Sequence, residues 1–183
     1  MKLETPPQNE EEIIPELDSG KSLLPKPSTG PITDLKELLV PIDFSDCSKH
    51  ALRYALAFAK QFDARITLLS VVAGSHTSFD FANAEYITNR DAHEKKYSDE
   101  LSKLAEKELG KTRYKIVVRS GRPYEEIVVA ARDLDADLII ISTHGTMGLQ
   151  RAEIGSTAER VVRFATCPVL VVRQKEREFA PPV

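Results

Sequence analysis

The sequence predicts an α/β fold in which a five-stranded, mainly parallel sheet carries helices on both faces, as in a Rossmann-like open sandwich. Three observations lead to this fold class. Short apolar runs alternate along the chain with segments whose apolar residues recur at helical spacing. Most connections between these segments are short, which favours crossovers between parallel strands. The run 138–141 is apolar on both faces, as expected of a central parallel strand.

A proline-rich segment precedes the first of these runs. Six of the 11 prolines lie in the first 31 residues, and residues 1–34 carry seven acids, three lysines and no aromatic side chain. Such a composition cannot bury enough apolar surface to offset the entropy of ordering. We therefore expect a disordered or extended arm over 1–34, a folded domain over 35–175 and a short tail over 176–183. A partner-binding role is the alternative reading of the arm.

The domain is expected to open with a strand and a helix. Residues 38–42 form an apolar run that ends at Asp43, which is typical of a buried strand. Ser45 and Asp46 follow as a favourable N-cap region. Apolar residues at helical spacing then predict an amphipathic helix over 46–62.

The middle of the domain is less regular. Residues 65–72 are the second strand. The polar stretch 74–89 is too long for an ordinary connection, so it is either a functional loop or part of the helix that ends near Gly110. Residues 115–118 form the third strand.

The last third repeats the alternation of helix and strand. Pro123 suits the first position of a third helix, which leads to the strand 138–141. Residues 156–159 have the form of a capping box that opens a fourth helix, and Pro168 ends it. Residues 169–172 are the fifth strand.

Composition argues against several classes of protein. The net charge of −3 and the pI of about 5.9 lack the basic excess of nucleic-acid binders. No run approaches the ~18 apolar residues of a membrane span, and the acidic N-terminus lacks the apolar core of a signal peptide. Two cysteines are too few for a disulfide framework. We therefore expect a cytoplasmic protein that binds neither nucleic acid nor membrane.

Cys47 and His50 lie three residues apart on the first expected helix. Two ligands fall short of a zinc site, so we expect no protein metal site. The expected arrangement is a packed Cys47 and a surface His50.

The candidate site lies where two strands end. In parallel sheets, ligands bind beyond the carboxyl ends of strands, at the point where the strand order reverses. Asp43 follows the first strand, and the glycine-containing segment 142–156 follows the fourth. Glycine lets backbone N–H groups approach an anion, and a helix N-terminus favours phosphate. The alternative is that the glycines only make turns, that Ser156 only caps a helix and that Asp43 only accepts backbone N–H groups in its turn.

Four segments resemble the universal stress protein family. They are VPIDFSDCS, SGRPYEEI, DADLIIISTHG and GSTAERVVRFATCPVLVVR, and they lie within a region of resemblance that runs from Leu38 to Val172. The nucleotide-binding branch of that family carries G-x2-G-x9-G-[ST]. This chain fits the pattern from Gly145 to Gly155 and Ser156, but Ser142 stands where the first glycine belongs.

The resemblance implies a site for ATP or AMP, with any Mg²⁺ arriving together with the phosphates. Asp43 would bond to the base or sugar, Val71 would pack on the adenine, and the 155–157 segment would hold the phosphates. Arg151 is a further candidate phosphate contact. The nucleotide-binding residues implied in this way are Pro41, Ile42, Asp43, Val71, Ser142, His144, Gly145, Gly155, Ser156 and Thr157.

The resemblance also implies a biological role and an assembly. It implies a stress-response or signalling module that forms a homodimer through antiparallel pairing of the edge strand Val169–Val172 and acts on a further protein partner. No motif places a base to activate water, so we expect no enzyme activity beyond slow ATP hydrolysis. The alternative, favoured by Ser142, is a dimeric interaction module of the same fold that binds no nucleotide.

Overall fold

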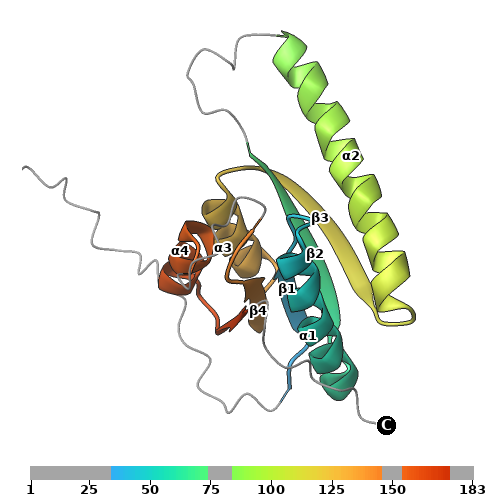
Figure 1. Ribbon diagram of the computed structural model, residues 1–183, viewed down its shortest axis with the longest axis vertical. Helices are drawn as coiled ribbons and strands as arrows, with labels where there is room; N and C mark the ends of the chain where they lie inside the picture. Colours follow the sequence, from blue (N-terminus) through green and yellow to red (C-terminus); the bar gives the residue numbers. More distant parts are fainter. Residues whose placement is uncertain (1–33, 74–83, 146–153, 174–183) are drawn as a thin grey trace, which may run out of the picture.

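The computed structural model describes residues 34–73, 84–145 and 154–173, which form a five-stranded parallel sheet and four helices (Figure 1). The expected fold class is confirmed, with every strand pair parallel. In chain order the elements are β1 (Glu37–Pro41), α1 (Asp46–Phe62), β2 (Arg65–Ala73), α2 (Ala84–Leu109), β3 (Tyr114–Gly121), α3 (Pro123–Asp133), β4 (Leu138–Ser142), α4 (Ser156–Phe164) and β5 (Val169–Val172).

Some expectations fall on residues that the structure does not describe. These are the arm up to residue 33, residues 74–83, Arg151 and the tail from residue 174.

The strands are ordered β3-β2-β1-β4-β5, so β1 lies at the centre between β2 and β4. The register places Leu39 of β1 beside Thr67 on one side and Ile139 on the other. From β1, the chain adds β2 and then β3 on one side, and it adds β4 and then β5 on the other side. The strand order therefore reverses between β1 and β4.

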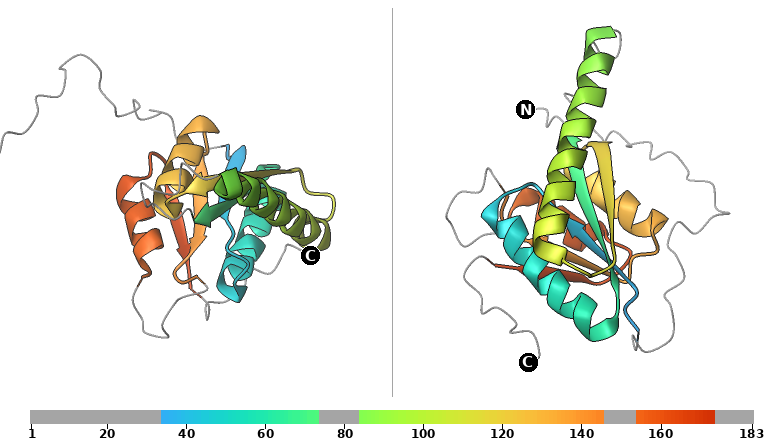
Figure 2. Two further views of the ribbon diagram at one scale, coloured as in Figure 1. Left: turned by 90° about the horizontal axis from the view of Figure 1, so that it is seen from above. Right: turned by 90° about the vertical axis from the view of Figure 1, so that its right-hand side faces the viewer.

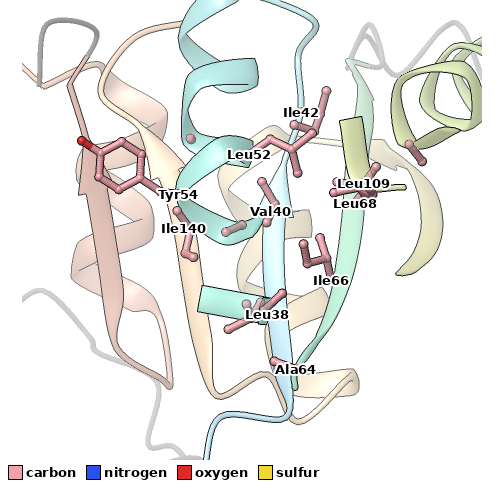
Figure 3. Close-up of a cluster of buried hydrophobic side chains, with 14 of the residues drawn as sticks. Leu38, Val40, Ile42, Leu52, Tyr54, Ala64, Ile66, Leu68, Leu109 and Ile140 are labelled. Carbon is pink, nitrogen blue, oxygen red and sulfur yellow. The ribbon is translucent and has the colours of Figure 1, made fainter. Parts of the chain in front are cut away.

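Two apolar layers sandwich the sheet, because successive strand side chains point to opposite faces. Leu38 and Val40 pack with α1 and α2, whereas Leu39 packs with α3 and α4. Figure 2 shows these helix pairs on opposite sides of the sheet, and Figure 3 shows the α1/α2 layer in detail. Burying each large aliphatic side chain contributes about 1.5–3 kcal/mol, which makes these layers the main source of stability.

Polar contacts hold the amino ends of the central strands together. The Asp137 carboxylate, just before β4, accepts hydrogen bonds from the N–H groups of Lys36 (2.7 Å) and Glu37 (2.9 Å). Glu37 is buried and in turn accepts from Arg65 Nε at 2.7 Å and from the Thr67 hydroxyl. These contacts join β1, β2 and β4 at the edge opposite the candidate site.

The first three helices and their strands follow the sequence pattern with two extensions. Helix α2 begins at Ala84, so residues 84–89 of the undecided polar stretch are helical. Strand β3 runs on to Gly121, beyond the apolar run 115–118. The added strand residue Arg119 is accommodated because β3 is an edge strand and its guanidinium reaches Asp133 of α3 at 2.9 Å.

The expected boundaries of the fourth helix are wrong. Gly155 is the N-cap residue of α4, and Ser156 is its first helical residue, so residues 156–159 do not act as a capping box. The N–H of Glu159 donates to the carbonyl of Gly155 at 3.0 Å, closing the first turn. The helix ends at Phe164 because Ala165 already has an extended backbone, three residues before Pro168.

Candidate functional site

The candidate site lies at the carboxyl edge of the sheet, where β1 and β4 end side by side. The chain leaves β1 toward α1 on one face and leaves β4 toward α4 on the other. This is the topological switch point at which open α/β sheets bind ligands. The sequence prediction that the segments after these two strands share one site is therefore supported by the topology.

Asp43 shapes the turn after β1. Its Oδ1 accepts hydrogen bonds from the N–H of Ser45 at 3.1 Å and from the Ser45 hydroxyl at 2.6 Å. Ser45 Oγ also accepts from the N–H of Ser48 at 3.1 Å, and so caps α1. The turn-forming role of Asp43 is thus real, yet the residue is exposed and its second carboxylate oxygen lies against Gly145.

Phe44 adopts a backbone conformation that is unusual for a bulky residue. Its φ is +64°, in the left-handed region, which costs about 1–2 kcal/mol for an L-residue. The ring packs edge-on against Tyr97 of α2, with centroids 5.7 Å apart. Aromatic packing offsets this cost and holds the Asp43 turn against α2.

Two glycines permit close approaches within the chain itself. A Cβ on Gly145 would lie 2.3 Å from Asp43 Oδ2, and a Cβ on Gly155 would lie 2.9 Å from the carbonyl oxygen of Thr143. Neither glycine has a left-handed φ. Glycine is therefore required at these positions by space and not by backbone conformation.

Thr143 joins three parts of the edge and was missed by the sequence analysis. Its N–H donates to the carbonyl of Val172 at 2.9 Å, and its own carbonyl accepts the N–H of Gly155 at 2.8 Å. Its hydroxyl lies 3.0 Å from Nδ1 of His144. Thr143 stands at a position that the family pattern leaves open, so no sequence motif pointed to this role.

The N-terminus of α4 meets the edge beside Thr143. Within the described ranges, no side chain caps this helix, because its N-cap is Gly155. The first N–H groups of any α-helix lack partners inside the helix and carry a partial positive charge. Ser156 is exposed and Thr157 is half-buried at this end. The arrangement provides several donors for an anion.

The apolar residues of the predicted site lie at the same edge. Pro41 ends β1 and is half-buried, whereas Ile42 is buried and donates its N–H to the carbonyl of Leu69 at 2.8 Å. Val71 lies two residues beyond Leu69 on β2 and packs, half-buried, against the α3/α4 layer. Strands β1 and β2 thus bring these three side chains to the edge that carries Asp43.

Ser142 and His144 complete the set of predicted site residues. Ser142 ends β4, is buried, and donates its hydroxyl to the carbonyl of His144 at 2.9 Å. His144 is half-buried, next to the exposed Gly145. All ten predicted residues therefore lie on the β1, β2 and β4 ends or at the start of α4.

Cys47 and His50 lie on α1, and Cys167 lies shortly before β5. His50 is buried, 8% exposed, and stacks edge-on with Tyr54, so the expectation of a surface histidine is wrong. Burial raises the pKa of the Cys47 thiol, and burial with the nearby Asp137 charge raises the pKa of Cys167 to about 11. Both thiols thus remain protonated near neutral pH, in their less nucleophilic form. In the ranges described, no group of three or more potential ligands from His, Cys, Asp and Glu is placed to hold a metal ion.

Comparison with known proteins identifies the family. The family model of the universal stress proteins matches residues 35–173. The chain belongs to the universal stress protein family. A universal stress protein of Methanocaldococcus jannaschii is 34% identical over 145 residues, covering 78% of this chain and 85% of that protein.

Solved structures of universal stress proteins share the fold. A second protein of the same organism is 32% identical over 157 residues. Its structure matches with a TM-score of 0.69 at 28% identity and covers 78% of this chain and 99% of that one. Another universal stress protein, solved in complex with cAMP, has a TM-score of 0.56 at 20% identity over 77% of this chain and 98% of that one. At that identity, the likeness concerns the fold alone.

Proposed function

We propose that this universal stress protein binds an adenine nucleotide, ATP or AMP, at the carboxyl edge between β1 and β4. The observation that carries the proposal is the N-terminus of α4, which has glycine as its N-cap residue and is held against the end of β4 by the bond from Gly155 N–H to the Thr143 carbonyl. A helix N-terminus without a side-chain cap, at a switch point, is a recurrent phosphate site.

The two sides of this edge differ in chemistry. The exposed Asp43 carboxylate is an acceptor, and it repels phosphate but suits the hydroxyl groups of a sugar or the amine of a base. The start of α4, with the exposed Ser156 hydroxyl, is a donor side that favours an anion. A ligand with donors at one end and phosphates at the other matches both sides, and a nucleotide has this shape.

The choice of adenine rests on the family resemblance. The Gly145-x9-Gly155-Ser156 spacing fits the nucleotide-binding branch, and a protein of this fold has been solved with cAMP. Mg²⁺ would enter bound to the phosphates, which supply hard oxygen ligands, and not from a dedicated protein site. We propose no enzyme activity beyond slow hydrolysis of bound ATP. Release of phosphate or pyrophosphate from ATP measures this activity.

The role that we propose is a cytoplasmic signalling module in the response to stress. Bound nucleotide would shift the protein between two states and so bias a surface that another protein reads. No helix among the described residues is long and apolar enough to cross a membrane.

We further propose a homodimer through β5, which is an edge strand with three half-buried residues. Sedimentation equilibrium tests this assembly, and a monomer at ~50 μM would contradict it.

Calorimetric titration of the nucleotide-free protein tests the proposed function. Mg-ATP is expected to bind with a Kd in the micromolar range, about −8 kcal/mol, and Mg-UTP at least tenfold more weakly. No heat and no competition at millimolar ATP would contradict nucleotide binding. That result would support the alternative of an interaction module, which the serine at position 142 favours.

A further inference from the structure

Ser142 is the point at which this chain departs from the glycine pattern of its family. It is the last residue of β4 and is 8% exposed, and its hydroxyl donates a hydrogen bond to the carbonyl of His144 at 2.9 Å. A glycine at this position has no side chain to make that bond. The departure therefore adds a contact within the turn that leads to Gly145.

The contact fixes the direction of the peptide unit between His144 and Gly145. The described residues contain no cis peptide bond, and in a trans peptide the N–H points opposite to the C=O. The His144 carbonyl is directed toward the buried Ser142 hydroxyl, so the N–H of Gly145 is turned outward. Gly145 itself is exposed and lies beside Asp43.

The backbone bonds of Thr143 hold that residue in place without fixing the next peptide unit. Thr143 is anchored by its N–H to Val172 and by its carbonyl to Gly155. Neither bond fixes the rotation of the following peptide unit, because two backbone dihedrals of His144 lie between Thr143 and Gly145.

We propose that Ser142 is a positioning residue: its hydroxyl holds the His144 carbonyl so that the Gly145 N–H stays oriented toward an oxygen of the bound nucleotide. This inference rests on the proposed function. A donor that is held in place before the ligand arrives costs less conformational entropy on binding. Ser142 thus acts through Gly145 and need not touch the nucleotide.

The test compares Ser142→Ala with a matched serine elsewhere in the sheet. Ser70 of β2 is also buried, and its hydroxyl has no hydrogen-bond partner among the described residues. Ser70→Ala is therefore the control for removing a buried hydroxyl. Ser142→Gly, which restores the family pattern, is the second variant and removes the same bond.

The first readout is the ¹⁵N relaxation order parameter of the Gly145 amide in the nucleotide-free protein. We expect Ser142→Ala and Ser142→Gly to lower it, while Ser70→Ala leaves it unchanged. An unchanged Gly145 amide in both Ser142 variants overturns the proposal. So does a general loosening, in which the amides of β1 and β5 lose as much order as Gly145.

The second readout is the affinity for Mg-ATP. Without the Ser142 bond, the peptide unit before Gly145 must be ordered when the nucleotide binds, at a cost of about 1 kcal/mol. We therefore expect about fivefold weaker binding by Ser142→Ala and no change for Ser70→Ala. Equal affinity of wild type and Ser142→Ala overturns the positioning role. If the wild-type protein binds no ATP, the proposed function fails, and the order parameter still decides whether Ser142 holds the turn.

Discussion

Gly145→Ala is expected to weaken ATP binding at least tenfold, or by about 1.4 kcal/mol. A Cβ at this position would lie 2.3 Å from Asp43 Oδ2, far inside van der Waals contact. The Asp43 side chain cannot rotate away freely, because its other oxygen is bonded to the N–H and hydroxyl of Ser45. Either Asp43 or the Gly145 backbone must move, and each is a proposed contact of the nucleotide. Isothermal titration measures the loss.

Two comparisons separate this cause from a general loss of stability. Gly110→Ala places a Cβ in open space but at φ +55°, so it is expected to lower stability and leave ATP affinity unchanged. Asp43→Ala removes the atom that the new Cβ meets, so Gly145→Ala is expected to cost less folding free energy in that background. Equal cost in both backgrounds, or wild-type affinity of Gly145→Ala, would contradict the clash.

Gly155→Ala is expected to reduce both stability and nucleotide binding. The new Cβ would lie 2.9 Å from the Thr143 carbonyl, a backbone atom that cannot move alone. Relieving this contact breaks the bond from Gly155 N–H to that carbonyl, at a cost of about 1–3 kcal/mol of unfolding free energy. The start of α4 then moves away from β4, and ATP affinity falls with it. Urea unfolding and titration measure the two effects.

Gly155→Ser distinguishes this contact from helix capping. The backbone of Gly155 (φ −64°, ψ 151°) suits any N-cap residue. As an N-cap, serine stabilises a helix slightly more than glycine does, by a few tenths of a kcal/mol. Capping alone therefore predicts equal or higher stability for Gly155→Ser. The contact with Thr143 predicts a loss similar to that of Gly155→Ala. A stabilised Gly155→Ser variant that binds ATP normally would show that the close approach is unimportant.

The sequence was sufficient to predict the fold because local patterns determine it. The apolar runs of β1, β4 and β5 and the helical spacing of α1 are read from neighbouring residues. The switch-point rule then places Asp43 and the Ser142–Gly145 segment at one edge without any side-chain detail. Polar residues were harder, because the start of α2 and the end of β3 carry little apolar periodicity. The start of α2 was therefore left undecided, and β3 was predicted too short.

The details that the sequence could not predict depend on contacts between distant residues. Serine and threonine at the start of α4 are good caps in isolation, yet Gly155 takes that position because its N–H reaches Thr143. The polarity of His50 suggested the surface, but the face of α1 on which it lies is buried. Glycine spacing suggested a phosphate loop without revealing that Gly145 makes room for Asp43.

We propose that an adenine nucleotide binds between the Asp43 turn, the end of β4 and the start of α4. Backbone amide chemical shifts of the ¹⁵N-labelled protein, followed during titration with AMP, locate the bound nucleotide. We predict the largest shifts at Asp43, Gly145 and residues 155–157, with the amino ends of β1 and β4, near Asp137, unaffected. Unchanged shifts at these positions with millimolar AMP, or the largest shifts at the amino edge of the sheet, would contradict the site.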